Sequence, residues 1–91
     1  MVCGYVAGGY YAVSAQGQPT FLDFGQGFPG EVFRVVIWGA ERSKFKEPPE
    51  QSYNRRQVCV TGKIQLERGK PEIVVKDPAQ LVLDQLYMDP E

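Results

Sequence analysis

The chain has 91 residues, enough for one small domain. Its composition is 43% hydrophobic and 23% charged, which is typical of a globular protein and not of a disordered one. The absence of His excludes imidazole bases and His-based metal sites, and two Cys are too few for a Cys-only zinc site. No apolar run approaches the roughly 18 residues that cross a bilayer, so we expect no membrane span.

The formal net charge of -1 hides an uneven distribution. All ten Lys and Arg fall between Arg34 and Lys76, whereas residues 84–91 carry three acids and no base. We therefore expect one folded domain over residues 1–83 and an acidic C-terminal tail over residues 84–91. A chain this close to neutral lacks the strongly basic balance of a typical duplex-DNA-binding protein.

Runs of β-forming residues predict five strands, over residues 2–13, 20–24, 32–38, 57–66 and 71–75. Three glycines in the first run would be costly in a helix, but in a strand they permit strong bending. In the fourth run Val58, Val60, Ile64 and Leu66 are expected to share one face. Turn residues separate the strands, and Gly69 is available for positive φ in the last hairpin.

Between the third and fourth strands, residues 40–46 contain good helix formers and precede Pro48 and Pro49, which predicts a short helix. Residues 47–55 read as an exposed connection. After Asp77 the pattern is compatible with a helical turn around residues 80–86 or with loose packing. Five strands with a helix between the third and fourth predict a mainly β fold, a five-stranded closed Greek-key barrel of the OB type. Closure of the barrel would also remove exposed strand edges.

Two stretches carry a family resemblance: VFRVVIWGAERSKF, and RRQVCVTGKIQLERGKPEIVVKDPAQL, which contains the distinctive segment from Val58 to Val75. Together with CGYVAG and GQPTFLDFG near the N-terminus, they resemble small bacterial OB-fold domains of the nucleic-acid-binding superfamily. The resemblance covers roughly Cys3 to Leu81. It implies the barrel fold, and it implies nucleic-acid binding as one of several ligand classes that such barrels accept.

Ligands of OB-folds usually lie across the second and third strands, between the loop that joins strands one and two and the hairpin that joins strands four and five. If Val35 and Ile37 fill the barrel, Arg34, Val36 and Trp38 face outward. The expected nucleic-acid-binding residues are Phe21, Arg34, Val36, Trp38, Lys63, Arg68 and Lys70.

Each of these positions also has a structural interpretation. Trp38 offers a face on which a base can stack, but it would equally cover a barrel end as part of the core. Arg34 would either reach a ligand or pair with Asp23 across the hairpin. Arg68 and Lys70 are the best candidates for phosphate contacts. Residues 42–46, in contrast, are expected to form an ordinary solvated surface.

The leading functional hypothesis is weak, largely non-sequence-specific binding of single-stranded DNA or RNA, in isolation or as part of a larger fused polypeptide. The alternatives are a protein-interaction or structural module, which uses the outer face of strands two and three or apolar residues between 81 and 88, and oligosaccharide or small-ligand binding in the same groove. Catalysis is not expected, because the acids lack the tight spacing of a metal-dependent nuclease. No cofactor and no metal are implied.

Cys3 and Cys59 lie on the predicted first and fourth strands, which pair with each other in an OB barrel. We expect a disulfide between them, with two reduced thiols as the alternative. A disulfide would favour an exported or periplasmic protein, and free thiols a cytoplasmic one.

Overall fold

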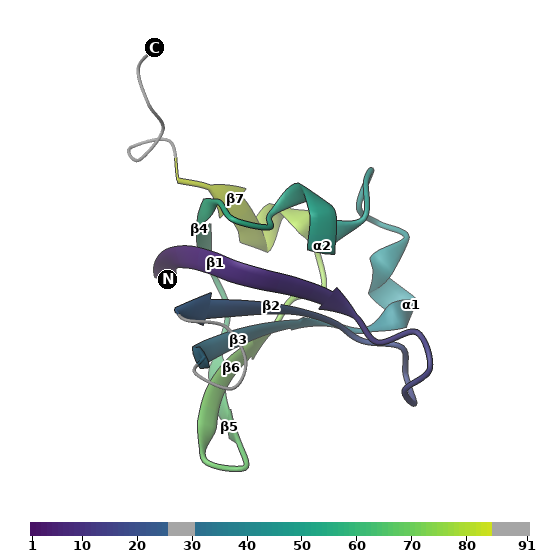
Figure 1. The fold of residues 1–91 in the computed structure, drawn as a ribbon, viewed down its shortest axis with the longest axis horizontal. Coiled ribbons are helices and arrows are strands. Elements are labelled where there is room, and N and C mark those ends of the chain that lie inside the picture. The colour runs from purple at the N-terminus through teal and green to yellow at the C-terminus, as the bar shows by residue number, and fades with distance from the viewer. Residues whose placement is uncertain (26–30, 85–91) are drawn as a thin grey trace.

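The fold is mainly β, as predicted, and is shown in Figure 1 as a computed structural model that describes residues 1–25 and 31–84. The strands are β1 (Val2–Tyr11), β2 (Thr20–Gly25), β3 (Glu31–Ile37), β4 (Gln57–Val60), β5 (Ile64–Glu67), β6 (Lys70–Val74) and β7 (Leu81–Leu83). Two single-turn helices, α1 (Gly39–Arg42) and α2 (Pro49–Ser52), and a 3-10 turn, η1 (Pro78–Gln80), complete the elements. No helix in these residues is long and apolar enough to cross a membrane.

The strands form one sheet in the order β5-β6-β3-β2-β1-β4-β7. β3 and β6 are parallel, and the other neighbours are antiparallel. The prediction of a five-stranded closed barrel was wrong, because the sheet formed within residues 1–25 and 31–84 has seven strands and is not closed. β5 and β4 lie at or near opposite ends of the strand order although they are neighbours along the chain.

A break at Thr61–Lys63 explains why the predicted fourth strand is two strands. Gly62 lies against β6 so closely that an added Cβ would be 2.6 Å from Cγ2 of Ile73. Gln80 of η1 forms two hydrogen bonds with the backbone of Thr61 in the break. The Thr61 N–H donates to the Gln80 carbonyl (2.8 Å), and Gln80 Nε2 donates to the Thr61 carbonyl (2.9 Å). These bonds satisfy polar groups that a partner strand would otherwise satisfy.

The break also redirects the side chains that follow it. Val58 and Val60 of β4 are fully buried, as their alternation predicted. Ile64 and Leu66 of β5 are instead 52% and 71% exposed. The interpretation that all four side chains share one buried face was therefore wrong for the last two, because β5 continues into a hairpin that extends away from the core (Figure 1).

The core lies on the inner face of the sheet and is built mainly from alternate residues of β2, β3 and β4, with further residues from β1, from β7 and from β6 and the position after it. Its members are Val6, Leu22, Phe24, Phe33, Val35, Ile37, Val58, Val60, Ile73, Val75 and Leu81. The rings of Phe24 and Phe33 meet edge to face at 5.3 Å. Phe24 also covers the backbone of β1, where a Cβ on Gly4 would lie 2.8 Å from Phe24 Cδ2. The strongly bent first strand thus uses a glycine where a ring packs on it.

The helical segment differs from the prediction in two ways. The helix expected over residues 40–46 ends at Arg42, and a second helix, α2, forms within the predicted exposed connection. Pro49 is the first residue of α2, a position at which its missing N–H costs nothing. α2 packs directly on β1 at Gly9. The contact is so close that a Cβ on Gly9 would lie 2.6 Å from the Glu50 carbonyl oxygen.

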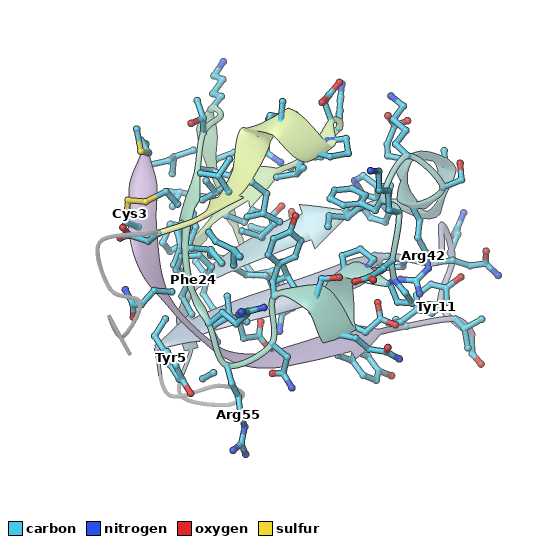
Figure 2. The ribbon with its side chains drawn as sticks, turned by 90° about the horizontal axis from the view of Figure 1, so that it is seen from above. Cys3, Tyr5, Tyr11, Phe24, Arg42 and Arg55 are labelled. Carbon is cyan, nitrogen blue, oxygen red and sulfur yellow. A yellow bond between two sulfur atoms is a disulfide. The ribbon has the colours of Figure 1, made fainter. Side chains whose placement is uncertain are left out.

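β4 pairs with both the first strand, β1, and the last strand of the described residues, β7. Cys3 and Cys59 are opposite each other in the β1–β4 ladder, and their sulfurs form a disulfide, as predicted (Figure 2). β7 pairs with the other edge of β4, so residues 81–83 form a strand and not the helical turn considered above. Residues 85–91 of the predicted acidic tail, with the apolar positions 86–88, lie outside the described residues.

Candidate functional site

A groove of about 410 Å³ lies on the outer face of the sheet, between β2–β3 and the β5–β6 hairpin. Its lining residues are Phe21, Phe33, Arg34, Val36, Trp38, Glu67, Arg68, Lys70, Pro71 and Glu72. Six of the seven residues predicted to bind nucleic acid are among them. Lys63 is the exception: it lies in the break between β4 and β5, where its side chain is exposed, and it does not line the groove.

The alternation of β3 determines which side chains reach the groove. Val35 and Ile37 are fully buried in the core, so Arg34, Val36 and Trp38 lie toward the opposite face. Trp38 is 43% exposed, whereas Val36 is only 2% exposed. Val36 therefore forms part of the floor of the groove, where it supports its neighbours and offers little contact area itself.

Arg34 is held in place from two sides. Its Nε donates to Asp23 Oδ1 at 2.7 Å, the cross-strand pair considered from the sequence. Its guanidinium lies 4.3 Å from the centre of the Phe21 ring. Tyr10 of β1 extends this row, since its ring is nearly parallel to that of Phe21 at 6.5 Å. The carboxylate and the aromatic ring together fix the position of the guanidinium.

Trp38 packs partly against the loop between β1 and β2. Gly17 has a φ of +79°, and a Cβ there would lie 2.9 Å from Trp38 Cε3. The Gly39 N–H donates to the Gly17 carbonyl at 2.9 Å and ties the loop to the end of β3. Part of the indole thus packs on the loop, and the exposed remainder borders the groove.

The opposite wall is a two-residue hairpin. Arg68 and Gly69 have φ values of +54° and +82°, and they are flanked by the paired residues Glu67 and Lys70. Two successive positive φ angles are the signature of a type I′ turn, whose twist matches that of the strands. The turn presents Arg68 and Lys70 at the groove beside Glu67 and Glu72. Three cations and two carboxylates line the groove, so its positive charge is modest.

The sequence did not single out Phe33, Pro71 and Glu72 as parts of this site, whereas Glu67 belongs to the hairpin turn that was expected to border it. Glu72 reaches it because β6 runs parallel to β3 with Arg34 opposite Glu72. Strand register of this kind follows from tertiary packing, and no local sequence signal reports it.

A second polar cluster joins the helices to the sheet at Arg42 (Figure 2). Its guanidinium forms a two-pronged ion pair with Glu50 (2.7 and 3.0 Å), donates to Thr20 Oγ1 (2.7 Å) and lies 3.6 Å from the centre of the Tyr11 ring. The prediction of a solvated surface was wrong for Arg42, because these partners bury most of it. Hydrogen bonding to Arg42 lowers the pKa of Glu50 below its usual value, and the same bonds raise the pKa of Arg42.

Substitution Glu50→Gln is expected to lower the free energy of unfolding by about 1 kcal/mol at neutral pH, since Arg42 loses a charged partner. The folded-state pKa of Glu50 is depressed, so its contribution is present above the unfolded pKa and disappears as pH falls through the folded value. Wild type and variant should therefore converge in acid. Urea unfolding at neutral and acidic pH measures this.

Glu41→Gln is the matched control, because Glu41 pairs with the exposed Lys44. It should change stability little at either pH. An equal effect of the two substitutions would contradict the role given to Arg42–Glu50.

Cys3, Cys59 and Asp84 place potential metal-ligand atoms within 4.8 Å of one another. Both sulfurs belong to the disulfide, however, and a metal would need thiolates.

Comparisons of the chain with protein-family models, curated proteins and solved structures find no match.

Proposed function

We propose that the groove binds single-stranded nucleic acid weakly and with little sequence preference. The observation that carries this proposal is that the groove has an aromatic wall and a cationic wall on opposite sides. One wall holds the stacked Arg34–Phe21 pair and the half-exposed Trp38, and the other holds Arg68 and Lys70. Flat π surfaces facing cations match the alternation of bases and phosphates along a single strand.

The flat wall would contact the bases. A base that stacks on Trp38 gains about 1–3 kcal/mol, and every base has a π face to offer. The guanidinium of Arg34 lies over Phe21, and bases also stack on arginine guanidinium planes. Neither contact reads the edge of a base, which is why we expect little sequence preference.

The hairpin would contact the phosphates. Arg68 and Lys70 supply two positive charges on this wall of the groove. For single strands, log K falls with log salt with a slope of roughly 0.7 per neutralised phosphate, so two contacts give a slope of about -1.4. Glu67 and Glu72 in the same groove reduce the net attraction, in agreement with weak binding.

The strand pairing supports a distant relation to the OB-fold in an open form. The loop that contains Gly17 and the Arg68–Gly69 turn flank the outer face of β2–β3, and OB-folds bind oligonucleotides between loops at these two places. Here the fourth strand of that fold would correspond to β4 and β5 together. The proposal does not require a closed barrel, because the groove is formed by β2, β3 and the hairpin alone.

The disulfide adds an inference about location. Disulfides persist in oxidising compartments and are rare in the cytosol. The Cys3–Cys59 disulfide therefore favours a protein that works after export.

The direct test is a titration with oligothymidine at low and moderate salt. Binding is monitored through the fluorescence of the single tryptophan, which borders the groove. We expect quenching at low salt and a slope of about -1.4. The double variant Arg68→Gln/Lys70→Gln should bind several-fold more weakly at low salt and lose most of the slope.

The variant Lys46→Gln/Arg56→Gln is the matched control, since it removes two exposed cations that do not line the groove. Its affinity and slope should remain close to those of wild type. The proposal fails if the wild type does not bind at low salt, or if both double variants weaken binding equally.

A further inference from the structure

β5 is an edge strand with unusually complete exposure. It lies at one end of the sheet, pairs with β6 alone among the strands in residues 1–25 and 31–84, and all four of its residues are exposed. It forms the outer strand of the hairpin that projects from the body in Figure 1. An exposed edge of this kind presents hydrogen-bonding groups to which another strand can pair.

The register shows which backbone groups point to the free edge. The Val75 N–H donates to the Val36 carbonyl, so the odd residues of β6 bond toward β3 and its even residues bond toward β5. Glu72, an even residue, is opposite Gln65. The N–H and C=O groups of Gln65 therefore point to β6, and those of Ile64 and Leu66 point outward. Pro71 has no N–H, and this fits the pattern. It is an odd residue opposite Leu66, so it is not required to donate a hydrogen bond to β5.

We propose that two copies of this chain associate by antiparallel pairing of β5 with β5, centred on Gln65. In this register Ile64 lies opposite Leu66 of the second copy, and the twofold axis repeats the pair. Their outward-pointing backbone groups then form the ladder hydrogen bonds of the new strand pair. The apolar side chains, 52% and 71% exposed in one copy, cover each other.

Charge complementarity selects a second copy as the occupant. Centred pairing places Lys63 opposite Glu67 of the second copy, and the symmetry makes this contact twice. A shift by one residue would place groups that already bond to β6 against groups that point outward. A shift by two that puts Leu66 opposite itself would place Ile64 against Arg68 and leave Lys63 without an acid. Among these registers, only the centred one matches apolar with apolar and acid with base.

The contact is short, so the dimer is weak. A pair of four-residue strands buries far less than the roughly 1,600 Å² of a standard stable interface. Association should therefore depend on concentration. A twofold axis perpendicular to the sheet would place the outer faces of both copies, and with them both grooves, on the same side.

Sedimentation equilibrium without nucleic acid tests the pairing independently of the proposed function. With rising concentration, the average mass of the wild type should increase from 10.2 kDa toward twice that value. Leu66→Glu should remain at the monomer mass. Val13→Glu is its control, because Val13 is similarly exposed, at 55%, but lies outside β5, and it should associate as the wild type does.

Charge reversal tests the register. Lys63→Glu and Glu67→Lys should each abolish association, because like charges would then face each other twice, and the double variant K63E/E67K should restore it. Circular dichroism monitors the fold of each variant. A wild type that stays monomeric at every concentration, equal behaviour of L66E and V13E, or failure of the double variant to restore association would each overturn the proposal.

Discussion

Loss of the Cys3–Cys59 disulfide is expected to reduce the free energy of unfolding by about 4 kcal/mol. The two cysteines are 56 residues apart in sequence, and the bond restricts the unfolded chain between them. It also fastens the first residues of β1 to β4, in a ladder that runs from Val2–Val60 to Tyr5–Gln57. A loss of this size is a large part of the stability of a small domain.

Urea unfolding of the oxidised protein and of the variant Cys3→Ser/Cys59→Ser measures the effect. Thiol titration of the unreduced, denatured wild type should find no free thiol. Wild type treated with a non-thiol reductant should unfold at the same urea midpoint as the variant. Two titratable thiols in the untreated protein, or identical midpoints with and without reductant, would refute the disulfide.

Substitution Trp38→Ala is expected to weaken oligonucleotide binding by about 1–3 kcal/mol, or roughly 5- to 150-fold. The indole borders the groove, and its exposed part offers a flat surface on which a base can stack. Trp38→Phe should recover part of the loss, since a smaller ring still stacks. Fluorescence anisotropy of a labelled oligonucleotide measures all variants, including those that lack the tryptophan.

Tyr5→Ala is the matched control. Tyr5 is an aromatic residue of β1 with similar exposure, 45%, and it does not line the groove. Thermal unfolding separates loss of binding from loss of fold, because Trp38 also packs on Gly17. Wild-type affinity in Trp38→Ala, or equal losses in both alanine variants, would remove the basis for stacking in this groove.

The sequence predicted the strands well where their pattern was locally determined. The alternation around Val35 and Ile37 correctly placed β3 and assigned its two faces. The same alternation failed between Val60 and Ile64, because the break is caused by contacts of Gly62 with Ile73 and of Thr61 with Gln80. These partners are distant in sequence, and the local pattern of apolar residues does not predict contacts with them.

The candidate site shows the same division. The groove-lining positions on β2, β3 and the hairpin were predicted from strand alternation and the expected fold, and the structure brings six of seven together. Arg42 was missed because its partners Thr20, Tyr11 and Glu50 come from three other segments. Helix α2 was missed because the Pro48-Pro49 pair indicated a terminator, whereas Pro49 starts a new turn.

The hydrogen bonds of Gln80 have a consequence for the shape of the groove. Gln80 bonds both backbone groups of Thr61, and its side-chain oxygen accepts the N–H groups of Lys76 and Asp77. This single residue therefore ties the end of β4 to the segment that follows β6, at the base of the projecting hairpin. The hairpin carries Arg68 and Lys70, so Gln80 holds the base of one wall of the groove although it does not line the groove itself.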